Sequence, residues 1–282
     1  MSENISFRIY DDTSSSDDDD DINNINNINN INIKKFSYIK SKKDSRDHIY
    51  KPANVSNASN VSSIDLRNLC SKIEDQETLG SCTGNAIVGI LEYLNKKTKN
   101  INIELSRLFI YYNERLLEGT VKYDNGAQIR SGIKACNKWG FCSEALCPYD
   151  IKKFNILPTK ESYLEASKNK VISYECILNF NHMKKALING NPVVIGFDVY
   201  SSFLKINKKG IMLYPSKNER NLGGHAVVIV GFNDNYLNNK GYFICRNSWG
   251  VEWGDKGYFY MPYEVIKNTN MSWDFWIIKS IT

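Results

Sequence analysis

Apolar residues recur at helical spacing in three stretches of the first half of the chain. The first stretch has five of them on one face: Ala86, Ile87, Ile90, Leu91 and Leu94. Polar residues around Lys99 and Asn100 end that pattern. The same spacing returns over 105–117 and over 127–139, and Gly140 stops the last stretch. The patterns predict three helices in succession.

After about residue 170 the pattern changes to short β-rich runs with Gly and Asn between them. Six runs are expected to form strands: 171–177, 193–200, 226–231, 242–246, 257–261 and 275–278. A short helix is expected around 182–188. Helices followed by strands predict an α+β fold, with a helical half at about 82–170 and a β half at about 171–282.

The first sixty residues differ in composition from the rest. Residues 1–33 combine an Asp run at 17–21 with Ile-Asn-Asn repeats, and such a segment cannot bury enough apolar surface to offset its ordering entropy. We therefore expect a disordered acidic, Asn-rich tail at 1–33. Residues 34–60 are rich in lysine and polar residues, which is typical of an extended linker.

Composition excludes several classes of protein. Of the 282 residues 42% are hydrophobic, which suffices for a core, but no apolar run approaches the ~20 residues of a membrane-spanning helix. The N-terminus lacks the basic and apolar regions of a secretory signal, so we expect an intracellular, cytoplasmic protein.

Charge adds little to this picture. Residues 1–60 carry 10 acidic and 8 basic side chains, for a net charge of −2, and residues 61–282 carry 21 and 28, for a net charge of +7. The lysines are scattered rather than gathered in one patch, which is typical of a solvated surface. We expect neither a nucleic-acid partner nor a membrane partner.

The seven cysteines show no metal-ligand spacing. They stand at 70, 82, 136, 142, 147, 176 and 245, and no two are separated as in a C-x2-C motif. Without a secretory signal, reduced thiols are expected. The sequence therefore predicts no metal site and no cofactor. Because seven is an odd number, at least one thiol remains free in any pairing scheme.

Cys82 follows Gly80-Ser81 and opens the first apolar helix. The first N–H groups of a helix lack intrahelical partners and carry partial positive charge, so they favour a thiolate, which is the nucleophilic form of cysteine. A buried structural cysteine is the alternative interpretation, because cysteine is among the most frequently buried residue types.

A base and an orienting group are found further along the chain. Of the three histidines, His225 begins the apolar run His-Ala-Val-Val-Ile-Val-Gly, 143 residues after Cys82. Asn247 begins the turn Asn-Ser-Trp-Gly, where its amide can accept a hydrogen bond from an imidazole and the indole of Trp249 can shield that bond from water. Taken alone, each motif is more often structural.

Together and in this order, Gln-x3-Gly-Ser-Cys, His-Ala-Val and Asn-Ser-Trp-Gly resemble the papain family of cysteine proteases. The resemblance covers about residues 61–282 and implies a two-lobed fold, helical and antiparallel β, with the active-site cleft between the lobes. It implies that Cys82 is the nucleophile, His225 the base and acid, and Asn247 the residue that orients the imidazole. Gln76 would supply the side-chain donor of the oxyanion hole.

The resemblance also implies where a substrate binds. Four residues would lie beside it: Asn125, Gly126, Gly224 and Trp249. Trp273 and Asp274 align loosely with the base of the family's main specificity pocket, although a plain structural strand is the alternative there. Departures such as Thr83 after the nucleophile and Leu79 in place of a cysteine resemble the compact branch of bacteria and large DNA viruses.

We therefore expect a monomeric cysteine endopeptidase that acts on polypeptides through a thioester acyl-enzyme, in the cytoplasm or, if viral, in the virion. A non-catalytic binding or structural relative and another thiol acyl-transfer enzyme remain alternatives. Within the linker, five apolar residues could anchor a short propeptide that partly covers the cleft: Phe36, Tyr38, Ile39, Ile49 and Tyr50.

Overall fold

The computed structural model describes residues 36–52, 61–236 and 240–282, so the tail expected at 1–33 lies outside the described residues. The described strands form one antiparallel sheet in the order β2-β7-β3-β4-β5-β6, and β1 pairs with β4. Their bounds are β1 (Ser63–Asp65), β2 (Val171–Ile177), β3 (Val193–Tyr200), β4 (Asn221–Asn233), β5 (Tyr242–Arg246), β6 (Tyr258–Pro262) and β7 (Ser272–Ile281).

Six α-helices accompany the sheet in the part of the chain that the structure describes. Their bounds are α2 (Cys82–Lys99), α3 (Arg107–Glu118), α4 (Ile129–Lys138), α5 (Lys160–Ala166), α6 (Phe180–Ile188) and α7 (Tyr263–Lys267). Side chains fix some of their ends. Ser106 accepts a hydrogen bond from the Phe109 N–H at the start of α3, and Gly119 ends that helix at φ +73°, where glycine is favoured.

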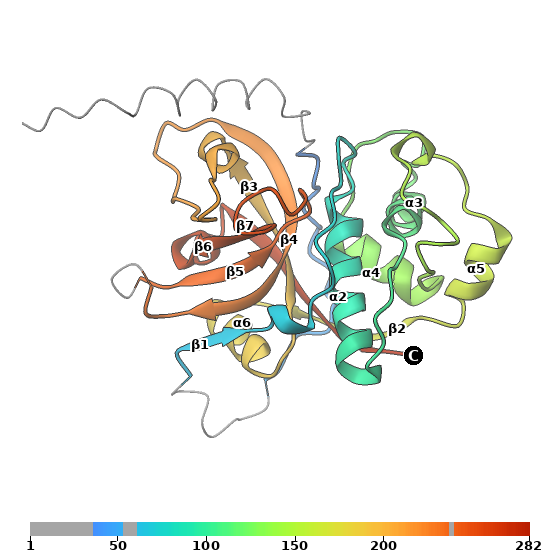
Figure 1. Cartoon of the computed structure of the whole chain (residues 1–282), viewed down its shortest axis with the longest axis horizontal. Coiled ribbons are helices and arrows are strands. Elements are labelled where there is room, and N and C mark those ends of the chain that lie inside the picture. The colour runs from blue at the N-terminus through green and yellow to red at the C-terminus, as the bar shows by residue number, and fades with distance from the viewer. Residues whose placement is uncertain (1–35, 53–60, 237–239) are drawn as a thin grey trace, which may run out of the picture. The chain divides into compact units, whose positions relative to one another are not determined.

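The two faces of the sheet pack against different partners. Along β4, Val227 and Ile229 belong to the apolar core of the β half, whereas Ala226, Val228 and Val230 belong to the cluster that α2 forms with the sheet. Side chains alternate between the two faces of a strand, so β4 is apolar throughout because both of its faces are covered. In Figure 1, α2 lies between the sheet and α3.

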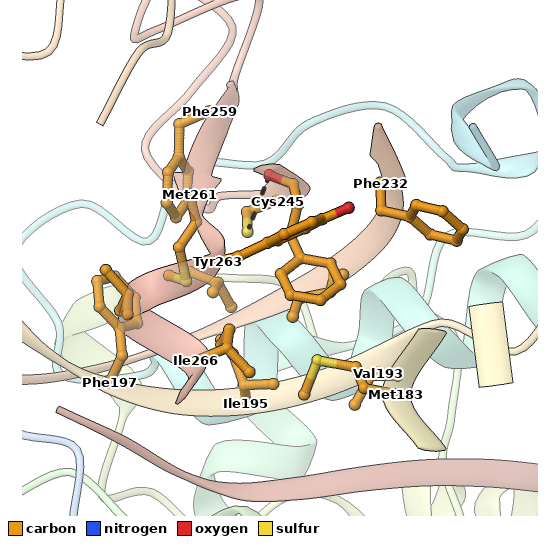
Figure 2. Packing of buried hydrophobic residues seen from close by; sticks show 14 of the residues in the cluster. Met183, Val193, Ile195, Phe197, Phe232, Cys245, Phe259, Met261, Tyr263 and Ile266 are labelled. Carbon is orange, nitrogen blue, oxygen red and sulfur yellow. Dashed lines mark hydrogen bonds between the residues drawn. The ribbon is translucent and has the colours of Figure 1, made fainter. Parts of the chain in front are cut away.

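The β half has its own core, shown in Figure 2. Fully buried side chains from β3, β5 and β6 meet there, among them Phe197, Cys245 and Phe259, and Met183 of α6 closes one side. The β half thus has an apolar core of its own, separate from the cluster that its other face forms with α2.

The fold class expected from the sequence, α+β with a helical and an antiparallel β half, is confirmed. Strands β2, β3 and β5 have the expected bounds, and β4 is longer than the expected 226–231. The sequence pattern did not predict β1, α5 or α7, which have three, seven and five residues. Such elements are too short for a hydrophobic period to show.

Residues 36–52 lie on the body of the protein. Figure 1 shows this segment in blue, passing between the strands and the helices. Ser37 pairs with Gly224 of β4 in a parallel bridge, and Ile49 pairs with Cys176 of β2.

Among the described residues, no helix has the length and apolar character needed to cross a bilayer.

Candidate active site

Cys82 is the first residue of α2, and none of it is exposed. Three backbone N–H groups face its sulfur and favour the thiolate, those of Cys82, Thr83 and Ala226. Two of them belong to the first turn of α2, where N–H groups have no intrahelical partner. The third, from Ala226, shows that β4 meets the start of α2 at the residue after His225.

His225 lies in β4 and is fully buried. Its Nε2 lies 2.8 Å from Oδ1 of Asn247, which follows the end of β5. Since the amide oxygen can only accept, Nε2 donates, and the other nitrogen of a neutral ring, Nδ1, carries a lone pair that can take a proton. The expected histidine and asparagine are therefore brought together in the orientation that a base requires.

The Asn-Ser-Trp-Gly turn also holds the loop before Cys82. The backbone N–H of Gln76 donates to the Ser248 carbonyl at 2.8 Å, and the Ser248 hydroxyl donates to Oε1 of Gln76 at 2.7 Å. With its oxygen held in this way, the buried Gln76 amide donates from Nε2 to the Leu79 carbonyl at 3.0 Å. An amide nitrogen has two hydrogens, so a second donor remains for an oxyanion.

Aromatic rings surround the imidazole. Trp249 lies with its ring centroid 5.2 Å from that of His225, and Phe203 lies 5.2 Å from Trp249 and 6.5 Å from the histidine. These apolar rings exclude water from the bond between His225 and Asn247, which strengthens it. Trp249 therefore takes the shielding position expected from the sequence, and Phe203 was not anticipated because nothing in its local sequence marks it.

Two of the residues expected beside a substrate, Gly126 and Gly224, contact residues 36–39 instead. The Tyr38 N–H donates to the Gly224 carbonyl at 3.2 Å, and the Ile39 N–H donates to the Ala127 carbonyl at 3.2 Å. Gly126 has φ +74°, and a Cβ built there would lie 1.9 Å from the Ser37 carbonyl oxygen. Only glycine allows this close approach. Asn125 is exposed at the neighbouring position.

The start of the segment covers the catalytic side chains themselves. The ring of Phe36 lies edge-on at 6.5 Å from His225 and at 5.8 Å from Trp249. Tyr38 is 7% exposed and belongs to the same apolar cluster as Cys82. The described segment thus lies beside residues that the sequence resemblance places next to a substrate.

The Cys82 side chain is fully buried in this conformation. Burial raises the pKa of the Cys82 thiol to about 12, since loss of water disfavours the thiolate more than the facing N–H groups favour it, and the carboxyl of Glu114 raises it further. The lowered pKa expected from the helix start is wrong for this conformation. In this conformation burial therefore favours the thiol form of Cys82 over the thiolate.

The rest of the segment is tied to the helical half and to the edge of the sheet. Asp47 forms an ion pair with Arg130 of α4 at 2.7 Å, and both side chains are only 11% exposed. Tyr50 is buried, and its N–H donates to the Cys176 carbonyl of β2 at 2.8 Å. Of the five expected anchors, Ile39 and Ile49 are exposed and take part through their backbone alone.

Comparisons with known proteins identify relatives of this chain. The family described as papain family cysteine protease matches residues 60–276. An uncharacterized peptidase C1-like protein of Acanthamoeba polyphaga mimivirus is 42% identical over 275 residues, covering 88% of this chain and 87% of the relative. A viral cathepsin of Adoxophyes honmai nucleopolyhedrovirus is 29% identical, covering 69% of this chain and 54% of the relative.

Solved structures share the fold. Xylellain, a cysteine protease from Xylella fastidiosa, is 37% identical with a TM-score of 0.80, covering 88% of this chain and 97% of that structure. Procathepsin L 3 of Tenebrio molitor larval midgut is 18% identical with a TM-score of 0.61, covering 89% of this chain and 78% of that structure, which shows likeness of fold alone.

Proposed function

Because the chain belongs to the papain family of cysteine proteases, we propose that it hydrolyses peptide bonds with Cys82 as nucleophile, His225 as base and acid, and Asn247 as the orienting residue. It is a thiol protease by family. The observation that carries the assignment of residues is the 2.8 Å bond between His225 and Asn247 on the strand whose Ala226 N–H faces the Cys82 sulfur.

In this proposal the first step is transfer of the Cys82 proton to Nδ1 of His225. The imidazolium and the N–H groups at the start of α2 then stabilise the thiolate, which attacks the carbonyl carbon of the substrate. Asn247 keeps Nε2 bonded, so the ring presents Nδ1 to the sulfur throughout. His225 afterwards donates its proton to the departing amine and leaves a thioester on Cys82.

The negative charge that develops on the substrate oxygen needs donors that are already in place. The free N–H of the Gln76 amide and the backbone N–H of Cys82 would supply them. The bonds of Gln76 to Ser248 and Leu79 hold its amide in one orientation before substrate arrives. Water activated by His225 then hydrolyses the thioester and restores the thiol.

We also infer that residues 36–52 hold the enzyme inactive. The segment forms two backbone hydrogen bonds, to Gly224 and Ala127, and its Phe36 ring lies beside His225, while burial raises the pKa of the Cys82 thiol. A tethered segment competes at high effective concentration, so weak individual contacts suffice to exclude a peptide. In this proposal, the enzyme acts only when this segment has moved away or has been removed.

Replacing Cys82 tests the proposal. Cys82→Ala is expected to abolish hydrolysis of a peptide library while the circular dichroism spectrum stays that of the parent protein. Cys176→Ala serves as a control, because that half-buried thiol lies in β2. Hydrolysis retained in Cys82→Ala, or lost equally in Cys176→Ala, contradicts the assignment.

A further inference from the structure

The side chain of Tyr38 fills a pocket beside the nucleophile. Its hydroxyl donates to the carboxylate of Asp274, and its ring lies 6.5 Å from that of Trp273 at an interplanar angle of 26°. The backbone N–H of Ser41 donates to the same carboxylate oxygen at 2.6 Å. Tyr38 therefore meets both an apolar wall and a charged acceptor at the far end.

Asp274 owes its position to an irregularity in β7. Against β3, Val194 pairs with Trp276 but Gly196 pairs with Trp273, so β7 has one extra residue between these pairs. Asp274 lies in this bulge with φ +55°, a left-handed conformation that costs free energy in any residue but glycine. Strain of this kind persists where the surrounding structure holds it, often beside functional sites.

The opposite wall is open because Gly196 has no side chain. A Cβ built at Gly196 would lie 2.3 Å from a carbon of the Tyr38 ring. Gly224 of β4 also contacts Tyr38, since a Cβ built there would lie 3.1 Å from another carbon of the same ring, so two glycines leave room for a flat ring. The pocket is thus deep enough for an aromatic side chain and ends on a carboxylate.

A substrate in the cleft would reach the same pocket. The Tyr38 N–H bonds the carbonyl of Gly224, which directly precedes His225, and Tyr38 shares an apolar cluster with Cys82. When the segment leaves, the Asp274 carboxylate loses the hydroxyl that it accepts from. A substrate ring without a hydroxyl would fill the space and leave that half-buried acceptor unsatisfied, which is costly.

We propose that this pocket selects substrates with tyrosine over phenylalanine, and that Asp274 is the residue that makes the distinction. The inference rests on the proposed function, because it concerns the side chain that a peptide presents beside Cys82. A hydrogen bond to a charged group is expected to favour tyrosine by about tenfold or more in kcat/KM.

The test uses the full chain and pairs of peptides that differ only by Tyr or Phe. The residue is placed in turn at each of the four positions before the cleaved bond, and kcat/KM is measured for each pair. Competition from the segment lowers both values of a pair by the same factor, so their ratio reports the pocket alone. At one position the ratio is expected to be about ten or more.

Two variants of Asp274 test whether this residue causes the preference for tyrosine. Asp274→Gly suits a positive φ and removes the carboxylate, so the ratio should fall to about one. Asp274→Asn keeps an acceptor without the charge, and its ratio should lie between. The control is Asp234→Asn, because Asp234 also accepts from a tyrosine, Tyr263 at 2.7 Å, but lies at the other end of β4.

Each outcome decides between the two proposals. Hydrolysis that depends on Cys82 but shows equal rates for Tyr and Phe at every position overturns the selection and leaves the proposed function standing. A preference that survives in Asp274→Gly, or is lost in Asp234→Asn, overturns the role of Asp274. If neither peptide is cleaved in a Cys82-dependent way, even after removal of the segment, the proposed function fails first.

Discussion

The Asn247 side chain holds the imidazole of His225 in position through one hydrogen bond. Its Oδ1 accepts from Nε2 of His225 and also from the backbone N–H of Ser248 at 2.9 Å, so the amide is fixed by its own turn. The imidazole is thereby held in one tautomer, while its buried aromatic neighbours limit other orientations. The role proposed for Asn247 is positional.

Asn247→Ala is expected to lower kcat/KM by about 10²-fold, because a misplaced imidazole forms fewer productive pairs with the thiol. The loss should be smaller than in Cys82→Ala or His225→Ala, which remove a reacting group. Asn137→Ala is a suitable control, since that amide bonds the Val171 carbonyl away from the cleft. An Asn247→Ala enzyme as inactive as Cys82→Ala, with an unchanged fold, would contradict the positional role.

Glu92 makes the free energy of unfolding depend on pH, and it lies outside the proposed catalytic site. It is 6% exposed, accepts from the Leu105 N–H at 2.8 Å and from the Ser71 hydroxyl, and burial raises its pKa to about 7. A carboxyl with a raised pKa in the folded state stabilises the fold while it is protonated. That stability is lost as pH rises from about 4.5 through about 7.

Glu92→Gln should remove this loss. A shift from 4.5 to about 7 corresponds to about 3 kcal/mol, so the variant should match the parent at pH ~4, below the unfolded-state pKa, and exceed its free energy of unfolding by about 3 kcal/mol at pH ~8. Urea unfolding at both pH values measures the difference, with the exposed Glu104→Gln as control. Parallel pH profiles for parent and variant would show that Glu92 is ionised without cost.

Local sequence was sufficient to propose catalytic residues, because each of them stands in a distinctive motif. Cys82 opens a helix, His225 begins a strand, and Asn247 begins an aromatic turn. The close contact of Gly196 could not be predicted in this way, because its partner is the ring of Tyr38, which lies 158 residues earlier in the chain. The sequence places Asp274 near a specificity pocket only approximately. Its position depends on a bulge, and a bulge is set by the register between two strands rather than by the sequence of either one.

Among the elements, the segment 36–52 differs from the linker that its composition predicts. Its lysines are exposed, whereas Phe36, Tyr38 and Tyr50 pack against the apolar clusters of the protein. Sequence patterning identified the aromatic residues as anchors, yet it could not show which backbone groups bind. The bonds of Tyr38 to Gly224 and of Ile39 to Ala127 involve main-chain atoms, which every residue carries.

Tyr38→Phe tests whether one hydrogen bond, from Tyr38 to Asp274, helps to hold the segment in place. Loss of the hydroxyl that binds Asp274 should loosen the segment and raise kcat/KM of the full chain toward a fixed small peptide by about tenfold. Tyr163→Phe is the matched control, because it removes a hydroxyl that donates to Asn113 at 2.8 Å within the helical half. Equal activity of Tyr38→Phe and the parent would show that the hydroxyl does not hold the segment in the cleft.

At the scale of the whole molecule, α2 connects the two halves. One side of this helix packs on β4 and the other on α3, and its first residue meets the strand that carries His225 (Figure 1). A nucleophile from the helical half and a base from the β half can meet only at this junction. The order of helices and strands was predictable from periodicity, whereas their packing depends on residues far apart in sequence.

Reaction with a peptide epoxide that alkylates thiols tests the central claim most directly. The full chain and a chain that begins at residue 61 are treated, and the modified cysteine is located by mass spectrometry while hydrolysis is followed. We expect a single adduct at Cys82, formed faster in the shorter chain, and a loss of hydrolysis in proportion to it. Full hydrolysis by a protein alkylated at Cys82, or equal rates of alkylation in both chains, would contradict the account.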